Sequence, residues 1–127
     1  MATMQTKIIE MSSFLDQFIS ENDIINQTLK SCQRAIDECE KEEIELELPP
    51  LNGMDKSKLH FKFEECSMLF KRIGRHQPCI RTTVNILFDE DYEGESLGVG
   101  YYSLDIDENG EVFDDWLILR RPDDLGG

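Results

Sequence analysis

The segment 105–110, Asp-Ile-Asp-Glu-Asn-Gly, constrains the fold more than any other part of the chain. Asn109 and Gly110 both tolerate a positive φ, and an Asn-Gly pair between two strand-like runs is a strong signal for a β-hairpin. The flanking runs 101–104 and 112–119 are rich in β-branched and aromatic residues, which favour strands. The chain is therefore expected to contain an antiparallel sheet with a turn at this segment.

The same segment also has features of a calcium-binding loop. An EF-hand loop has oxygen ligands at positions 1, 3 and 5, glycine at 6 and a bidentate glutamate at 12. Asp105, Asp107, Asn109 and Gly110 occupy positions 1, 3, 5 and 6, but position 12 is Trp116. The missing ligand and the strand-like flanks favour the hairpin, so we expect no metal site; divalent cation binding by the hairpin with the acidic loop 89–95 is the weaker alternative.

Two registers are open for this hairpin. A two-residue turn at Asn109 and Gly110 places Asp105 opposite Asp114 and Ser103 opposite Trp116. A three-residue loop with Gly110 in the left-handed position instead pairs Ile106 with Val112 and Tyr102 with Trp116. The second register gathers apolar groups on one face and avoids a like-charge pair, so it is preferred. If Asp105 and Asp114 are neighbours, their repulsion requires a cation, a proton or a basic side chain.

Chain length and composition predict a single domain. A chain of 127 residues buries roughly two-thirds of its unfolded surface, enough to fold without disulfides. The sequence lacks the apolar run of a secretory signal and any stretch approaching a membrane span, so we expect a soluble, cytoplasmic protein that does not bind membranes. Cys32, Cys39, Cys66 and Cys79 show no Cys-x-x-Cys spacing and are expected to be reduced, structural thiols.

The charge is distributed unevenly along the chain. The formal net charge is −14, yet the segment 56–81 contains seven basic residues against two acidic ones. The acidic residues lie mostly in the runs 37–47, 89–95 and 105–115. An acidic field disfavours nucleic acid, whose binding depends on cationic side chains, and would accelerate the encounter with a basic protein. Simple solubility explains the same excess of acid.

Apolar spacing predicts helices in the first part of the chain. Residues 7–19 carry a stripe at helical spacing, made of Ile8, Met11, Phe14, Leu15, Phe18 and Ile19. Ser20 is expected to cap a second helix with the stripe Ile25, Leu29, Cys32, Ile36 and Cys39. Residues 56–73 fit a third helix better than a strand, although a strand over 58–63 followed by a helix is the alternative.

The remaining residues alternate between apolar and polar types, as strands do. Residues 80–88 predict a half-buried strand, and 97–107 and 111–119 form the two arms of the hairpin. The prediction is an α+β fold with N-terminal helices on one face of a three- to four-stranded antiparallel meander. Residues 1–127 then form one domain, with a helical half over about 7–73, a sheet over about 79–120 and a frayed tail at 121–127.

Candidate chemical sites are weak. His76 and Cys79 are three residues apart, but no paired ligands complete a structural zinc site. Asp114 and Asp115 precede Trp116, yet alternation sends the two carboxylates to opposite faces of a strand. We therefore predict no catalytic residues and no cofactor, and consider an enzyme less favoured than a binding protein.

The hairpin combines aromatic and acidic side chains, a composition suited to gripping a basic surface. The leading hypothesis is a small, acidic, non-enzymatic interaction protein, of the inhibitor or immunity type, that binds a basic protein partner. Its predicted partner-binding residues are Tyr102, Asp105, Asp107, Glu108, Asp114 and Trp116. The alternative is a small-molecule or enzymatic pocket between the helices and the sheet.

Overall fold

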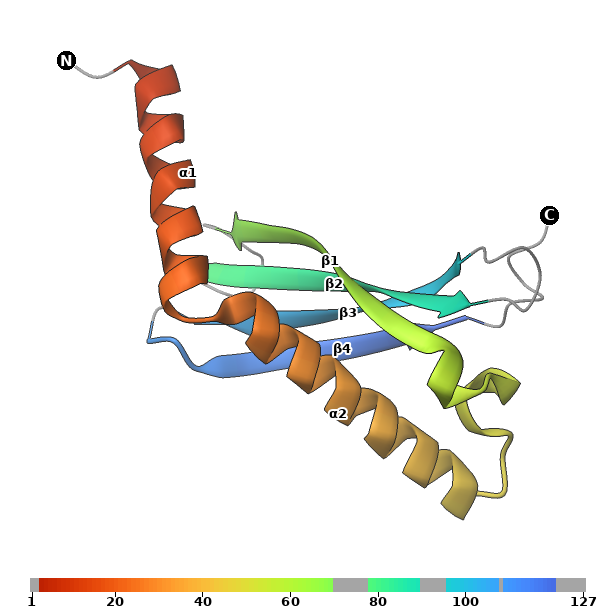
Figure 1. The fold of residues 1–127 in the computed structure, drawn as a ribbon. Helices are drawn as coiled ribbons and strands as arrows, with labels where there is room; N and C mark the ends of the chain where they lie inside the picture. Colours follow the sequence, from red (N-terminus) through yellow and green to blue (C-terminus); the bar gives the residue numbers. More distant parts are fainter. Residues whose placement is uncertain (1–2, 70–77, 90–95, 108, 121–127) are drawn as a thin grey trace.

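The computed structural model describes residues 3–69, 78–89, 96–107 and 109–120 of the chain. Two helices, α1 (Met4–Glu21) and α2 (Ile24–Glu45), are followed by the short 3-10 helices η1 (Pro50–Gly53) and η2 (Lys56–Lys58). Four strands then form one antiparallel sheet in sequence order: β1 (Leu59–Leu69), β2 (Cys79–Asp89), β3 (Ser96–Ile106) and β4 (Val112–Leu119). The predicted α+β fold is confirmed, with the helices on one face of a four-stranded meander (Figure 1).

The break between the two helices differs from the prediction. Ser20 lies inside α1, and the residue before α2 is Asp23, whose φ of 51° is left-handed. A non-glycine residue tolerates this region best when it is Asp or Asn, because a short polar side chain can bond locally. The Asp23 carboxylate accepts a hydrogen bond from Asn26 Nδ2 at 2.9 Å. The chain thus changes direction here without a glycine.

Strand β1 contradicts the helix predicted over 56–73. Phe61 and Phe63 pair with Ile86 and Val84, whereas the register shifts between Phe63 and Glu65. Glu64 is the extra residue of this β-bulge. After it, Cys66 and Met68 lie on the same face of the strand as Phe61 and Phe63. A bulge converts one step of two residues into a step of three. That single step made an alternating strand look helical. The predicted extension to residue 73 falls outside the described residues.

The β3–β4 hairpin combines features of both predicted registers. At the tip, Gly110 has a φ of +78° and Ile106 pairs with Val112, as the three-residue loop requires. The register then shifts between Asp105 and Ile106, so that Phe113 is an extra residue. Beyond this bulge, Ser103 pairs with Trp116 and Asp105 with Asp114, as the two-residue turn predicted. The preferred pairing of Tyr102 with Trp116 is wrong, because Tyr102 pairs with Leu117.

Helix α2 covers the inner face of the sheet and builds the core with it (Figure 1). Its buried residues Ile24, Thr28, Cys32 and Ile36 recur every four positions, which places them on one helical face. They pack with inward-facing strand residues that include Val84, Ile86, Tyr102 and Leu104. The Thr28 hydroxyl donates to the Ile24 carbonyl at 2.7 Å, so the polar group in this stripe is satisfied.

Helix α1 contributes little to this core. It meets α2 at a steep angle and its N-terminal part extends past the sheet (Figure 1). None of its side chains is fully buried, and Phe18 and Ile19 near its C-terminal end are the ones packed against the core. Among the described residues, no helix combines the length and the apolar character that crossing a membrane requires.

Candidate functional site

Tyr102, which the sequence offered as a binding residue, belongs to the core. Its side chain is 1% exposed, faces α2, and donates a hydrogen bond from its hydroxyl to Asp115 Oδ2 at 2.7 Å. Burial and then this bond raise the pKa of Tyr102 above its usual value. The hydroxyl therefore remains protonated at neutral pH and acts as a donor inside the fold.

Asp105 and Trp116 lie on the opposite, outer face of the sheet, where Arg81 joins them. The Asp105 side chain is 0% exposed and accepts hydrogen bonds from Arg81 Nε at 2.8 Å and from a terminal guanidinium nitrogen at 3.0 Å. The same guanidinium lies over the Trp116 ring, 4.5 Å from its centroid. Arg81 thus places a basic side chain beside the pair of Asp105 and Asp114, which is one of the three kinds of relief that this pairing was expected to need.

The sequence signal for Arg81 was present but incomplete. Arg81 alternates with inward-facing residues of β2, so its outward orientation follows from the strand pattern. Its position beside Asp105 follows only from the β2–β3 register, which pairs the two residues directly. That register depends on a bulge in the β2–β3 pairing between Ile86 and Leu87, where Val99 is the extra residue. Gly98 and Gly100 flank it, and glycine inside a strand often marks a bulge, so a sequence signal was present but was not used.

The remaining hairpin residues have separate roles. Asp107 Oδ1 accepts hydrogen bonds from the backbone N–H groups of Asn109 and Glu111, each at 2.9 Å, and so stabilises the turn. Asp114 is exposed on β4, and Glu108 lies outside the described residues. The structure divides the six predicted residues among the core, the outer face and the turn. Their role in partner binding stays a prediction.

A small polar hollow lies between α2 and β4, at the place where the sequence suggested a ligand pocket. Its volume is about 210 Å³, and polar lining groups come from Ser31, Arg34, Glu38, Tyr102 and Asp115. Pockets for drug-sized ligands usually measure about 300–1,000 Å³. This hollow suits a few water molecules or a very small polar ligand better than an organic substrate.

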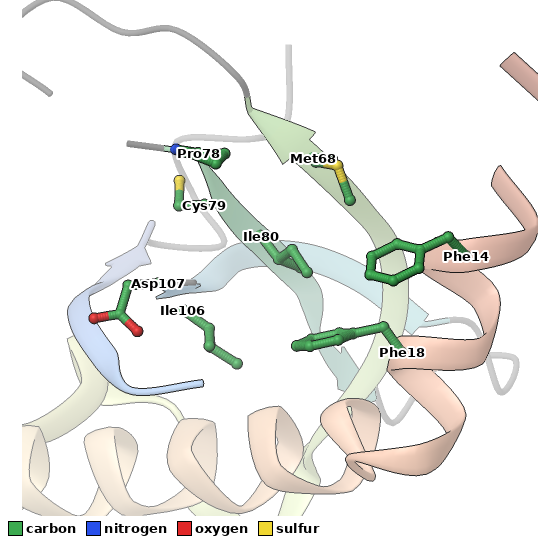
Figure 2. Close-up of a pocket in the computed structure, with 8 residues that line it drawn as sticks. All are labelled: Phe14, Phe18, Met68, Pro78, Cys79, Ile80, Ile106 and Asp107. Atoms are coloured by element: carbon green, nitrogen blue, oxygen red, sulfur yellow. The ribbon is translucent and has the colours of Figure 1, made fainter. Parts of the chain in front are cut away.

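An apolar groove lies where the C-terminal half of α1 approaches the end of the sheet. Phe14 and Phe18 project from α1 toward Met68 of β1 and Ile80 of β2 (Figure 2). The groove has a volume of about 240 Å³; its other lining residues are Pro78, Cys79, Ile106 and Asp107. Phe14 and Met68 also line a second hollow that continues along α1 beside Lys7, Glu10 and Met11. We call these two hollows together the α1 groove.

The helix beside this groove carries large apolar side chains on its surface. Ile8 is 55% exposed, Met11 44% and Phe14 57%. These residues belong to the apolar stripe that predicted the helix, and they stay exposed because only Phe18 and Ile19 at the C-terminal end of α1 pack against the core. Isolated exposed apolar residues are ordinary, but a continuous apolar face beside an apolar groove is typical of an interaction surface.

Two of the thiols, Cys32 and Cys39, are poorly suited to act as nucleophiles. All four cysteines are free, and burial raises the pKa of Cys32 to about 12. Burial, followed by a hydrogen bond to Glu43, raises the pKa of Cys39 to about 12. Both thiols are protonated at neutral pH, and the thiolate is the reactive form. Within the ranges that the structure describes, no three Cys, His, Asp or Glu side chains are grouped to hold a metal ion; His76 lies outside them.

No protein-family model, curated protein or solved structure matches this chain.

Proposed function

We propose that the chain is a non-enzymatic interaction protein that docks an amphipathic helix on the apolar face of α1 and in the α1 groove. The observation that supports this proposal is the set of large, exposed apolar side chains Ile8, Met11 and Phe14 beside a groove floored by Met68 and Ile80. Helix-in-groove recognition uses anchors at intervals of three and four residues, which is the spacing of this face.

The energy available at this surface is substantial. Full burial of one side chain such as Ile, Met or Phe contributes about 1.5–3 kcal/mol relative to leaving it exposed. Several such side chains offset the entropy of association and give a docking surface of useful affinity. The groove floor adds apolar contact that a bare helix lacks.

A protein helix fits this surface better than a lipid bilayer does. Interfacial helices usually carry lysine and arginine on their polar face, which anionic headgroups attract. Helix α1 has Lys7 as its sole basic residue, against Glu10, Asp16 and Glu21. With a net charge of −14, the whole chain would be repelled by an anionic surface.

The test uses two neighbouring isoleucines of α1 with nearly equal exposure. Ile8 is 55% exposed and lies with Met11 on the apolar face, whereas Ile9 is 57% exposed and lies on the opposite side of the helix. Ile8→Glu and Ile9→Glu introduce the same charge one residue apart. We expect Ile8→Glu bait to capture the native partner about tenfold less well, and Ile9→Glu to capture it normally.

Circular dichroism melts of both variants establish that each is folded, since both side chains are largely exposed. Equal capture by the two variants would show that the apolar face of α1 is not the docking surface.

A basic protein partner bound by the acidic hairpin is a second candidate. Glu111, Asp114 and Asp115 are exposed near the start of edge strand β4, which favours an electrostatic contact there. Tyr102 and Asp105 would support this surface from within the fold and make no direct contact, because both are buried. Such binding would weaken steeply as salt is added.

A further inference from the structure

We propose that the helix docked on α1 is α1 of a second copy of this chain, packed antiparallel in a two-fold symmetric dimer. This inference rests on the proposed function, because it names the occupant of the same surface. Four observations support it: the spacing of the apolar residues, the match between the two copies, the positions of the charges and the placement of the two sheets.

The apolar residues of α1 have the spacing of a coiled coil. Met4, Ile8, Met11, Leu15 and Phe18 follow one another at intervals of four, three, four and three residues. This is the alternation of a and d positions that lets two helices interlock their side chains. Leu15 and Phe18 are half-buried in one copy and the other three are exposed, so the seam is open along most of its length.

An antiparallel pair matches this seam with itself. Ile8 of one copy then packs against Phe18 of the second copy, and Met11 against Leu15 of the second copy. The two-fold axis repeats both layers, so the four layers built from Ile8, Met11, Leu15 and Phe18 are apolar, and Met4 lies beyond them near Asn22 of the second copy. Phe14 lies beside its own symmetry mate on the side of the groove. The N-terminal half of each α1 thereby covers the apolar groove of the other copy, where Phe18 and Ile80 lie.

Charges beside the seam favour the antiparallel arrangement. Lys7 and Glu21 are fourteen residues apart, which places both on the same flank of the seam. In the antiparallel pair, Lys7 of each copy faces Glu21 of the other. Glu21 already accepts a hydrogen bond from Gln17 Nε2 at 2.8 Å, and a carboxylate has further acceptor sites for a lysine. In a parallel pair, Lys7 would face the uncharged Ser12 instead.

The placement of the sheets supports the same choice. Helix α1 has 18 residues and is therefore about 27 Å long. An antiparallel pair holds the two α2–sheet bodies at opposite ends of this length, whereas a parallel pair brings two strongly acidic bodies together at one end. Specific dimers bury at least about 600 Å² per copy. A short helix pair approaches that area most readily when each groove also takes part.

Sedimentation equilibrium of the full chain over about 1–200 µM tests the dimer. We expect the native chain to approach twice its monomer mass of 14.7 kDa within this range. Ile8→Glu should raise the dissociation constant at least about 100-fold, because both copies lose an apolar layer. Ile9→Glu, the control from the opposite side of α1, should change it less than about threefold.

A charge exchange tests the antiparallel register. Lys7→Glu alone places two acids together at both ends of the seam and should weaken the dimer about tenfold. Glu21→Lys alone should weaken it similarly through two lysine pairs. The double variant Lys7→Glu/Glu21→Lys restores opposite charges in the antiparallel dimer, and should return the dissociation constant to within about threefold of the native value.

The outcomes distinguish this inference from the proposed function. A chain that stays monomeric at every concentration overturns the dimer, while partner capture lost in Ile8→Glu but kept in Ile9→Glu would still support docking on α1. A dimer that is insensitive to Ile8→Glu overturns the inferred interface. A dimer that Ile8→Glu disrupts but the double charge exchange fails to restore overturns the antiparallel register.

Discussion

Arg81 provides positive charge beside the paired aspartates Asp105 and Asp114 on the outer face of the sheet. Its guanidinium binds the buried Asp105 carboxylate through two hydrogen bonds and stacks on Trp116. These bonds to Asp105 raise the pKa of Arg81 above its usual value. We predict that Arg81→Met lowers the free energy of unfolding by about 3 kcal/mol, because the carboxylate stays buried without its guanidinium. Urea denaturation measures the change.

The matched control for this prediction is Arg34→Met, at an exposed arginine of α2, which should change stability by less than about 0.5 kcal/mol. In the double variant Arg81→Met/Asp105→Leu the two costs should not add, because the second substitution removes the buried carboxylate that Arg81 binds. Additive costs would mean that the pair is not coupled.

For these residues, the sequence indicated the charge repulsion between the two aspartates but not the side chain that relieves it. The repulsion between Asp105 and Asp114 was foreseen for one register, and the structure has that register around these residues. Tyr102 and Trp116 are both large aromatic residues, so residue type alone does not distinguish them. Tyr102 pairs with Leu117 and Trp116 pairs with Ser103, and these pairings place the two side chains on opposite faces of the sheet. A shift of one residue reverses the facing of a strand, so the site residues depended on a bulge at Phe113 that the sequence did not reveal.

Among the elements, the errors share a physical cause. Strand β1 looked helical because the extra residue Glu64 interrupts its alternation, and the apolar stripe of α1 did not reveal that most of its residues stay exposed. Periodicity reports which face of an element is apolar, but not what covers that face. Elements with unbroken patterns were predicted better: β2 was predicted correctly, and α2 was predicted apart from its start.

Strand β3 offers a test of how closely the strands approach one another. A Cβ at Gly100 would overlap the carbonyl oxygen of Ile118 on β4, whereas a Cβ at Gly98 would meet no atom within 4 Å. We predict that Gly100→Ala lowers the free energy of unfolding by about 1–3 kcal/mol, because the β3–β4 backbone must move apart. Gly98→Ala, two residues away in the same strand, should be neutral or slightly stabilising. Urea denaturation of the two variants measures both changes in the free energy of unfolding. Equal changes would contradict the close approach of β4 to Gly100.

For the whole molecule, chain length and hydrophobic pattern predicted the architecture better than they predicted the surface that we propose for docking. When helices precede an antiparallel meander, packing the helices on the sheet buries the apolar face of each. The two-layer arrangement therefore followed from the sequence. The exposed face of α1 did not follow, since it depends on where α1 ends relative to the sheet. The sequence hypothesis relied on acidic and aromatic residues, whereas the structure exposes several large apolar side chains on an N-terminal helix.

The sign of the salt dependence separates self-association from binding to a basic partner. Each copy carries a net charge of −14, and the two bodies of the antiparallel dimer are separated by roughly the length of α1, about 27 Å. The Debye length is about 30 Å at 0.01 M salt but about 8 Å at 0.15 M, so repulsion across the dimer acts at low salt and is screened at physiological salt. We predict that the dissociation constant of the dimer falls several-fold between these concentrations.

Sedimentation equilibrium at both salt concentrations measures this change. The double variant Lys7→Glu/Glu21→Lys has the same net charge as the native chain and should show the same trend. A basic partner on the hairpin would behave oppositely, because salt screens an attraction there. A dimer that weakens as salt rises would mean that attraction between opposite charges dominates the contact, and an apolar seam between two acidic molecules does not produce that result.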